Sequence, residues 1–394
     1  MRRGDLSQAV VDRLKRLPPP HAAHYGVVPS APPEHGVELG DALASLQRAT
    51  RAMAHVDVLA REPGGGFLVS RLLARREAVS SSAIEGTNST LDELLSVEEG
   101  AADETRHAAL QVRDYAIILE RHIRDAAADG PAVFTRSLVT TLHAQAMARD
   151  PDYRDVPGEI RTRVVWIGGA HDIAYSTYNP APPDSIEETL SDSVAYMRAE
   201  GMQVMTQSLI TRMAIAHAHF EAVHPFRDGN GRVGRLLLPL MMAADGQVPL
   251  YLAPYIEANK QEYYASLKAA QQKLDWATAV KFMADAVTGT VDELLATRAA
   301  LSSLADGWRD RRHFRKESAA LRALDVLPQY PVITAKRLAG QLEVSAPAAL
   351  NAIDHLVDAG ILKERTGYAR NRVFVASEVL SIVNRPFGAA PVLA

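Results

Sequence analysis

Apolar residues recur at helical spacing along most of the chain, so the sequence predicts a mainly helical protein. Within 206–223, for example, Ile210, Met213, Ala214 and Phe220 recur with the period of a helix and would share one buried face. The same period predicts further helices at 39–61, 67–84, 184–200 and 232–244, and two within 103–148 that break near 129–131.

One segment in the middle of the chain has the composition of a β-hairpin instead. Residues 161–167 are β-like, Gly168 and Gly169 offer a turn, and 173–178 can return as a partner strand. A lone hairpin in a helical protein is either a surface decoration or an element that covers a site. The pattern alone leaves both interpretations open.

The last quarter of the chain predicts a separate module. A highly charged stretch at 306–316 indicates a connecting helix. Helices are then predicted at 318–326, 335–342 and 346–359. A hairpin over 361–375 follows, and three helices with a hairpin are typical of a winged helix. Its third helix, which opens after Ser345, would be the one to meet DNA.

Charge supports DNA binding by this module only in part. Residues 307–372 hold 12 basic and 7 acidic side chains, a local charge of +5, whereas the whole chain carries −4. The third helix, however, offers a base edge little besides Asn351. Two alternatives therefore stay open, DNA binding and a role in packing or oligomerisation.

Composition favours a soluble intracellular protein. The chain has 394 residues, 47% of them hydrophobic, and its 43 basic and 47 acidic residues nearly balance. It has no cysteine, so disulfides are impossible, and its first residues lack the apolar region of a signal peptide. The longest apolar run, 236–244, is too short to span a bilayer. We expect a cytoplasmic protein without a membrane partner.

The strongest chemical signal is the stretch 224–235, which would form a loop between two helices. Its turn, Gly229-Asn230-Gly231, precedes the second helix. Such a turn presents free backbone N–H groups at the positive end of the helix dipole, which is a ready anion site.

The charged residues of the same stretch complete a pattern for phosphate chemistry. Arg232 and Arg235 are three positions apart and can reach one anion together. Asp228 suits a Mg²⁺ ion that is shared with phosphate oxygens, and His224 can accept a proton from a hydroxyl group. The combination predicts a phosphate-containing substrate and a general base.

This stretch resembles the signature of the Fic (filamentation induced by cAMP) family. The family pattern is His-x-Phe-x-(Asp/Glu)-Gly-Asn-Gly-Arg-x-x-Arg, and 224–235 matches every specified position. The resemblance implies an enzyme that transfers AMP from ATP to a hydroxyl side chain of a protein. In this reading His224 is the general base, Asp228 is the Mg²⁺ ligand, and Phe226 anchors the loop internally.

The resemblance also assigns the remaining residues of the stretch to ATP, the co-substrate. The backbone of Gly229 and Gly231 and the side chain of Asn230 would cradle the phosphates. Arg232 would bind the β-phosphate side and Arg235 the γ-phosphate, in the bidentate manner that guanidinium groups favour.

Two other segments resemble parts of the same family. The hairpin over 161–178 resembles the flap, on which the target protein docks by pairing its main chain. The pair Tyr263-Tyr264 resembles aromatic residues near the nucleoside end of the nucleotide, and two aromatic faces suit adenine. An aromatic pair on a helix is also typical of a core, so both readings of the tyrosines are kept.

A carboxylate at the end of the predicted helix 67–84 points to regulation. Glu85 lies just before Gly86, where the negative end of the helix dipole disfavours it, so a cationic partner is expected. The sequence pattern Ser81-x-x-x-Glu85-Gly86 resembles the inhibitory motif of the family. In that family the glutamate pairs with the second signature arginine, here Arg235.

The predicted fold is mainly α: a Fic-type helical domain with a small β-hairpin flap, plus a C-terminal winged-helix domain. The parts are a loosely packed N-terminal arm, a helical region with the inhibitory helix, the Fic core, a connecting helix, and the winged helix with a tail. In that order they occupy 1–40, 41–125, 126–298, 299–316 and 317–394.

Three functions fit these features. The first is a protein adenylyltransferase that Glu85 inhibits in cis. The second is a DNA-binding regulator whose Fic domain senses nucleotide. The third is a hydrolase that removes AMP, because the same carboxylate orients a water in relatives. The sequence does not name the target protein or its modified residue, and a homodimer stays open.

Overall fold

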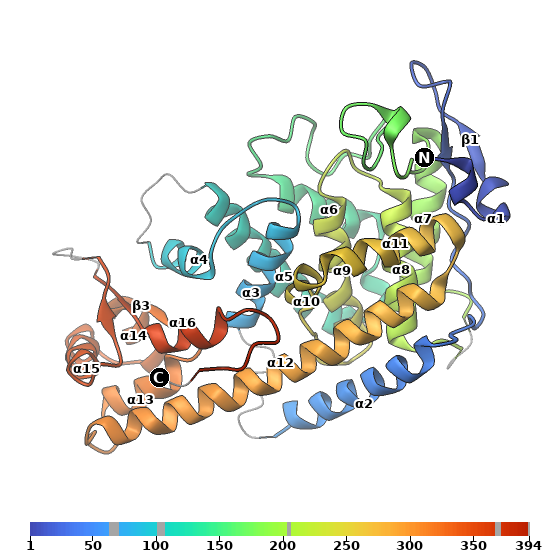
Figure 1. Ribbon diagram of the computed structural model, residues 1–394. Helices are drawn as coiled ribbons and strands as arrows, with labels where there is room; N and C mark the ends of the chain where they lie inside the picture. The colour runs from blue at the N-terminus through green and yellow to red at the C-terminus, as the bar shows by residue number, and fades with distance from the viewer. Residues whose placement is uncertain (63–70, 101–106, 203–205, 367–371, 393–394) are drawn as a thin grey trace. The chain divides into compact units, whose positions relative to one another are not determined.

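The protein is mainly helical, as the apolar pattern predicts (Figure 1). The structure is a computed structural model that describes residues 1–62, 71–100, 107–202, 206–366 and 372–392. The described helices are α1 (Gln8–Val11), α2 (Ala42–Ala60), α3 (Arg71–Ile84), α4 (Leu91–Glu98), α5 (His107–Asp129), α6 (Arg136–Met147), α7 (Ile186–Met197), α8 (Leu209–Val223), α9 (Asn230–Ala244), α10 (Ala253–Ala258), α11 (Lys260–Lys273), α12 (Trp276–Arg311), α13 (Ala319–Val326), α14 (Ala335–Leu342), α15 (Ala346–Asp358) and α16 (Ser377–Val383). The described strands are β1 (Leu14–Arg16), β2 (Tyr25–Val27), β3 (Val332–Thr334), β4 (Lys363–Glu364) and β5 (Val373–Val375), which pair in the antiparallel orders β1-β2 and β3-β5-β4.

The described residues pack into two compact units, and each unit is made of two chain segments. Unit 1 contains Met1–Leu59 and Ile117–Thr290, and unit 2 contains Ala60–Ala116 and Val291–Ala394. The sequence-based division follows chain order, whereas the units follow packing. The predicted N-terminal helical region, 41–125, is therefore shared between them.

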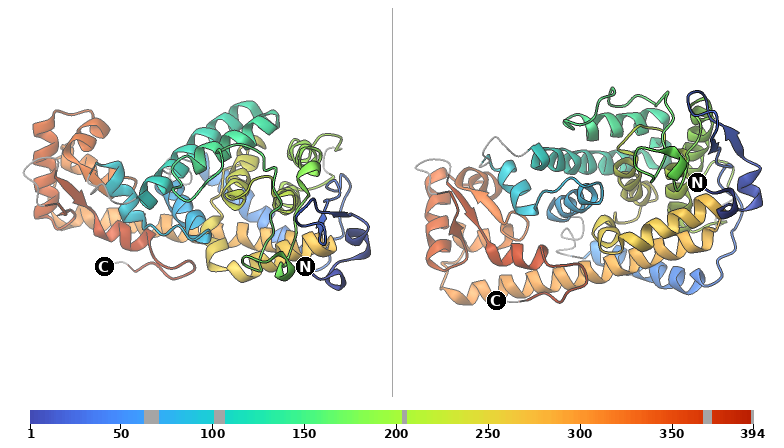
Figure 2. Two further views of the ribbon diagram at one scale, coloured as in Figure 1. Left: turned by 90° about the horizontal axis from the view of Figure 1, so that it is seen from above. Right: turned by 45° about the horizontal axis from the view of Figure 1, so that its top comes forward.

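Helices α8 and α9 form the centre of unit 1, and the signature loop connects them. In α8 every residue from 213 to 223 is buried, and in α9 every residue from 232 to 243. Helix α8 packs on α7, α9 and α11, and α9 packs on α6 (Figure 2). A helix that is apolar on nearly all sides belongs in an interior. Both ends of the loop are thus anchored in the core.

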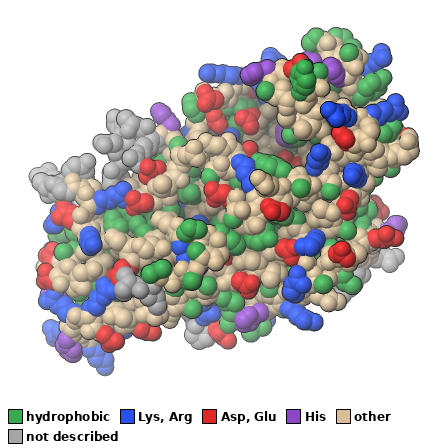
Figure 3. Space-filling view, in the orientation of Figure 1, with side chains coloured by type: hydrophobic (Ala, Val, Ile, Leu, Met, Phe, Trp, Pro, Cys, Tyr) green, Lys and Arg blue, Asp and Glu red, His purple; other side chains and the backbone are tan. Residues whose placement is uncertain are grey.

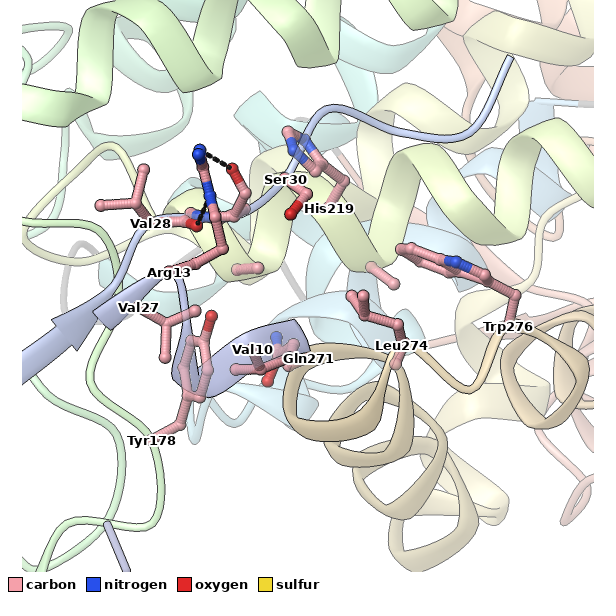
Figure 4. Close-up of a pocket in the computed structure, with 14 residues that line it drawn as sticks. Val10, Arg13, Val27, Val28, Ser30, Tyr178, His219, Gln271, Leu274 and Trp276 are labelled. Carbon is pink, nitrogen blue, oxygen red and sulfur yellow. Dashed lines mark hydrogen bonds between the residues drawn. The ribbon is translucent and has the colours of Figure 1, made fainter. Parts of the chain in front are cut away.

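The segment 1–40 is not the loosely packed arm that its prolines predict. Its two strands pair, and Val10 and Val27 are buried in one apolar cluster with Tyr178. Figure 4 shows the small pocket beside this cluster, where Arg13 donates to two backbone carbonyls of the segment that follows β2. Burial of these scattered apolar residues fixes the segment to unit 1.

The hairpin predicted over 161–178 is reduced to an isolated β-bridge between Ile167 and Tyr178. After the glycine turn, the returning half does not form a strand. Asp172 accepts a hydrogen bond from the backbone N–H two residues ahead and so caps a 3₁₀ turn, η4 (Ile173–Tyr175). Because the Asp172 side chain makes this local bond, the chain forms a turn and not a strand. The strand prediction for 173–178 is wrong.

Helix α12 replaces the predicted connecting helix. It runs from Trp276 to Arg311, so the charged stretch after 306 forms its last turns and is not a separate element. These 36 residues contain no proline to interrupt them. Along the described part of the chain, neither α12 nor any other helix is both long and apolar enough to cross a membrane.

The C-terminal part of unit 2 has the predicted helices and hairpin. The side chains of Thr334 and Ser345 cap α14 and α15 as expected, and β4 pairs with β5. Strand β3, which pairs with β5, and helix α16 were not predicted. The assignment of this part as a winged helix stays a prediction.

The exposed side of α15 does not favour DNA. Its exposed residues include Leu350, Asn351, Asp354 and Asp358. Asp358 pairs with Arg312 at 3.1 Å, and the carboxylate of Asp354 would be unfavourable beside a phosphate backbone. Acidic and basic side chains are interspersed on the face of the protein that Figure 3 shows. DNA binding therefore stays a prediction that this helix does not support.

Two adjacent glutamates at the end of α4 form ion pairs that connect parts of unit 2. Glu98 at the end of α4 binds Arg71 and Arg75 of α3. The next residue, Glu99, binds Arg337 at 2.8 Å and the N-cap of α14. Removing one partner of such a pair leaves the other charge without compensation in a poorly solvated place. Within unit 2, Glu98 therefore joins α4 to α3, and Glu99 joins the first chain segment to the second.

We expect Glu98→Gln to destabilise unit 2 by about 3 kcal/mol, because two guanidinium groups lose their shared carboxylate. Urea denaturation followed by circular dichroism measures the change. The matched control is Asp325→Asn, which removes the exposed partner of Arg309 within the same unit and should cost less than about 1 kcal/mol. Equal losses in the two variants would contradict the assignment.

Candidate functional site

His224 lies directly after α8 and turns the chain away from the helix. Its φ is 51° and its ψ is 62°, in the left-handed region that few non-glycine residues adopt, while its N–H still donates to the carbonyl of Phe220 at 3.0 Å. Glu221, one turn earlier, brings Oε2 to 3.9 Å from Nδ1 of His224. A carboxylate at this place favours the charged imidazole that a base becomes after it accepts a proton. Glu221 was not singled out from the sequence.

Phe226 holds the loop from the inside, as predicted. Its ring is 0% exposed and stacks on His143 with the ring centroids 3.7 Å apart. The Asn230 side chain accepts from the N–H of Phe226 and donates to its carbonyl, both at 2.9 Å. Because both ends of this buried amide bond the loop, the Asn230 side chain shapes the loop. A contact of the same side chain with phosphate stays a prediction.

His143 of α6 is a second residue that the sequence did not single out. Its Nδ1 accepts from the N–H of Gly158 at 2.8 Å, so Nε2 carries the proton that it shares with the carbonyl of Asp228, 3.0 Å away. Burial lowers the pKa of His143 to about 4, which keeps the ring neutral. The residue thus fixes the carbonyl of the predicted metal ligand. An isolated histidine on an apolar helix has no sequence pattern that would reveal this.

Asp228 is suited to Mg²⁺ that phosphate oxygens also bind. Its side chain is exposed, and among the described residues its carboxylate accepts one hydrogen bond, from the N–H of Gly229 to Oδ1 at 2.6 Å. Among the described residues no group of three acidic, histidine or cysteine side chains could hold a metal by itself. One carboxylate together with substrate phosphates is a usual Mg²⁺ site. The residues present therefore fit the ion in the presence of a nucleotide.

The N-terminus of α9 has the form of an anion site. Gly229 precedes it with φ +78°, and the helix begins without a side-chain cap. The first N–H groups of a helix have no intrahelical acceptor, so those of Asn230, Gly231 and Arg232 can bind an anion. The turn agrees with the sequence-based prediction.

The two signature arginines are both buried in α9. Arg232 is 4% exposed and donates to Oδ2 of Asp150 at 3.0 Å. Arg235 is 1% exposed, and its charge contributes to the lowered pKa of His217, which burial and this neighbour bring to about 3. Their guanidinium groups are therefore preorganised by the core, unlike those of exposed arginines. Binding of phosphate by either one stays a prediction.

The tyrosine pair is divided between core and surface. Tyr263 is 3% exposed, and its hydroxyl lies 2.8 Å from Nε2 of His217. This burial agrees with the core interpretation of Tyr263. Binding of the nucleoside by Tyr263 stays a prediction. Tyr264 is 47% exposed, and its ring centroid lies 5.2 Å from that of Tyr263. Stacking of the nucleotide base on Tyr264 stays a prediction.

Ser81 and Glu85 belong to unit 2. Ser81 is a buried residue of α3, and Glu85 is the first residue after this helix. Gly86 follows with φ +87°, the left-handed conformation expected of a residue that ends a helix. The local geometry agrees with the predicted motif, and its pairing with Arg235 stays a prediction.

Comparisons with known proteins agree on the family. The sequence model of the Fic/DOC family matches residues 133–242, and that of the Fic/DOC family N-terminal region matches 43–121. Protein adenylyltransferase fic-1 of Caenorhabditis briggsae is 41% identical over 113 residues, which are 29% of this chain and 20% of that protein. Probable protein adenylyltransferase aq_aa38 of Aquifex aeolicus is 30% identical over 95 residues, 24% of this chain and 27% of that protein. The chain thus matches less than a third of the length of either relative.

Solved structures agree on the fold. A Fic family protein from Desulfovibrio desulfuricans G20 aligns with a TM-score of 0.52 and 20% identity, over 87% of this chain and 98% of that one. A Fic domain containing signaling protein from Bacteroides thetaiotaomicron aligns with a TM-score of 0.51 and 17% identity, over 63% of this chain and 95% of that one. At this identity the likeness concerns the fold alone.

We expect Gly229→Ala to impair the site for two separable reasons. The positive φ costs about 1–2 kcal/mol for alanine, and the added Cβ would lie 2.6 Å from Sδ of Met147. Gly246→Ala is the matched control, because Gly246 has φ +74° and nothing within 4 Å. Calorimetry should show a larger loss of stability for Gly229→Ala, and ATP titration should show weaker binding for that variant alone. Similar values for both would contradict a tightly packed phosphate turn.

Proposed function

Because the chain belongs to the Fic/DOC family, we propose that it is a protein adenylyltransferase. It transfers AMP from ATP to a hydroxyl side chain of a target protein and releases pyrophosphate. The observation that carries the proposal is the loop between α8 and α9, where a histidine, an exposed carboxylate and an uncapped helix N-terminus occur within seven residues. ATP is the co-substrate.

His224 acts as the general base. Its imidazole accepts the proton of the target hydroxyl as the oxygen attacks the α-phosphorus, and the α–β phosphate bond breaks. Glu221, 3.9 Å from Nδ1, stabilises the imidazolium that results. The proton then leaves with water or with the pyrophosphate.

The remaining residues of the loop bind the nucleotide. Asp228 would hold Mg²⁺, which neutralises phosphate charge when it is bound. The N–H groups of the first turn of α9 bind phosphate oxygens, and Arg232 and Arg235 reach the β- and γ-phosphates from the same helix. Preorganised donors of this kind lower the barrier because they need not rearrange as charge develops.

The target protein docks along the segment 161–178, without the complete hairpin expected there. Residues 162–166 and 18–21 line a groove that also includes Arg227 of the signature loop. An extended target segment in this groove would bring its hydroxyl side chain toward the loop that carries His224. The groove supports docking beside the base, and generic main-chain pairing would supply the affinity.

Labelled ATP tests the function. Wild-type protein incubated with host lysate and Mg²⁺ should place labelled AMP on a protein, and His224→Ala should abolish the label. Asp228→Ala should remove the Mg²⁺-dependent transfer and keep the circular dichroism of the wild type, since its side chain is exposed. Absence of label combined with salt-dependent binding of duplex DNA would favour a nucleotide-sensing regulator instead.

Glu85 and Ser81 supply inhibition in cis within this proposal. A Glu85–Arg235 pair would compete with the γ-phosphate and leave the α-phosphorus misaligned for attack. A charge-assisted hydrogen bond contributes roughly 1.5–3 kcal/mol, and a misplacement of about 1 Å can lower a rate on the order of 10²-fold. The same carboxylate could orient a water for removal of AMP, which is the hydrolase alternative.

We therefore expect Glu85→Gly to raise incorporation of AMP at least about tenfold, and Arg235→Ala in addition to abolish the gain. Labelled-AMP incorporation on one target is compared for the wild type, the single and the double variant. Equal incorporation by the wild type and Glu85→Gly would exclude the inhibitory role. Release of AMP from modified protein by the wild type, but not by Glu85→Gly, would support the hydrolase.

A further inference from the structure

We propose that Arg161 is a positioning residue of the active site. It fixes the position of His224 and the position of the flap segment relative to His224. Its catalytic consequence rests on the proposed function, whereas its effect on the loop does not. Sequence analysis treated Arg161 only as the first residue of the flap.

The guanidinium group of Arg161 bonds the end of α8. Its Nε donates to the carbonyl of His224 at 2.7 Å, and Nη2 donates to the carbonyl of Val223 at 3.3 Å. The backbone N–H of Arg161 adds a bond to the carbonyl of Pro225 at 3.0 Å. Three consecutive carbonyl groups around the base are thus held by one residue.

These are groups that a helix leaves unbonded. The last carbonyls of a helix have no intrahelical donor, and a cation is favourable beside them because the C-terminus is the negative end of the dipole. The left-handed conformation of His224, with φ 51°, turns its carbonyl toward Arg161 rather than along the helix axis. Arg161 therefore acts as the C-terminal cap of α8 and as the support for the strained residue.

The same guanidinium group holds both ends of the flap segment. Its Nη1 donates to the carbonyl of Arg163 at 2.9 Å, and its Nη2 donates to the carbonyl of Ala181 at 2.7 Å. The residues between these two carbonyls, 164–180, contain most of the proposed docking segment 161–178. A target on the flap and the imidazole of His224 are thus positioned by one rigid, planar group.

The cost of burying the charge of Arg161 indicates a role beyond filling space in the core. Arg161 is 6% exposed, and within the described residues its side chain bonds backbone carbonyls and no carboxylate. Burial lowers its pKa to about 10, so it is still charged at neutral pH. Burying a cation with only carbonyl partners is costly. An apolar residue would fill the space more cheaply but could not bond four carbonyls in two segments. Lysine lacks the planar fork that these bonds need.

The test compares Arg161→Ala and Arg161→Lys with the control Arg212→Ala. Arg212 of α8 binds Asp245 just after α9, so its loss weakens the same helix pair without touching the loop. Below the unfolding temperature of each protein, we expect kcat for AMP transfer to fall at least about 30-fold in Arg161→Ala, by the misalignment argument. KM for ATP should change less than about threefold, because Arg161 makes no nucleotide contact in this scheme. Added guanidinium ion should restore part of the kcat of Arg161→Ala and leave the control unchanged.

Hydrogen exchange gives a readout that does not need activity. Amides in 224–229 should exchange faster in Arg161→Ala and as in the wild type in Arg212→Ala. If Arg161→Ala does not fold, Arg161→Lys decides: wild-type kcat overturns the proposal, and a loss of kcat at unchanged KM supports it. A kcat within about threefold of the wild type in Arg161→Ala, or equal losses in Arg161→Ala and the control, also overturns it. If the wild type transfers no AMP, the proposed function fails, and the exchange rates alone decide on Arg161.

Discussion

The loop between α8 and α9 depends on hydrogen bonds from buried side chains to its own backbone. Arg161 holds the carbonyls around His224, His143 holds the carbonyl of Asp228, and Asn230 holds both polar groups of Phe226. A buried backbone group without such a partner would be costly. The loop is therefore shaped before any nucleotide arrives, and its reactive side chains do not have to supply its structure.

This arrangement divides the signature into two kinds of residue. Phe226 and Asn230 face inward and determine the course of the chain, whereas Asp228 faces solvent and is available for chemistry. Arg232 and Arg235 are buried as well, so the protein supports their charges in the core. In the sequence, the signature looks like a continuous set of ligands. In the structure, some of its residues hold the loop in the conformation that the remaining residues need.

The sequence predicted most helices and the signature loop, because both depend on local patterns. Helix α8 and the cap of α14 at Thr334 follow from spacing and capping chemistry. What local patterns could not show is long-range packing: Val10 and Val27 bury part of the N-terminal segment, and Tyr263 lies in the core. The roles of His143 and Arg161 were not predicted for the same reason. Each acts on a carbonyl at least 60 residues away, which no local pattern records.

The two-segment construction of unit 2 limits how this protein can be shortened. Glu99 lies in the first segment, while its partners, Arg337 and the cap of α14, lie in the second. A recombinant fragment that stops after 298 would keep Glu99 and lose Arg337 and the cap of α14, to which Glu99 binds. Glu85 directly follows α3, and in this fragment α3 would belong to a unit that lacks most of its second chain segment. A fragment with unusually high activity would therefore report damage to the support of that helix as readily as removal of a separate inhibitory module.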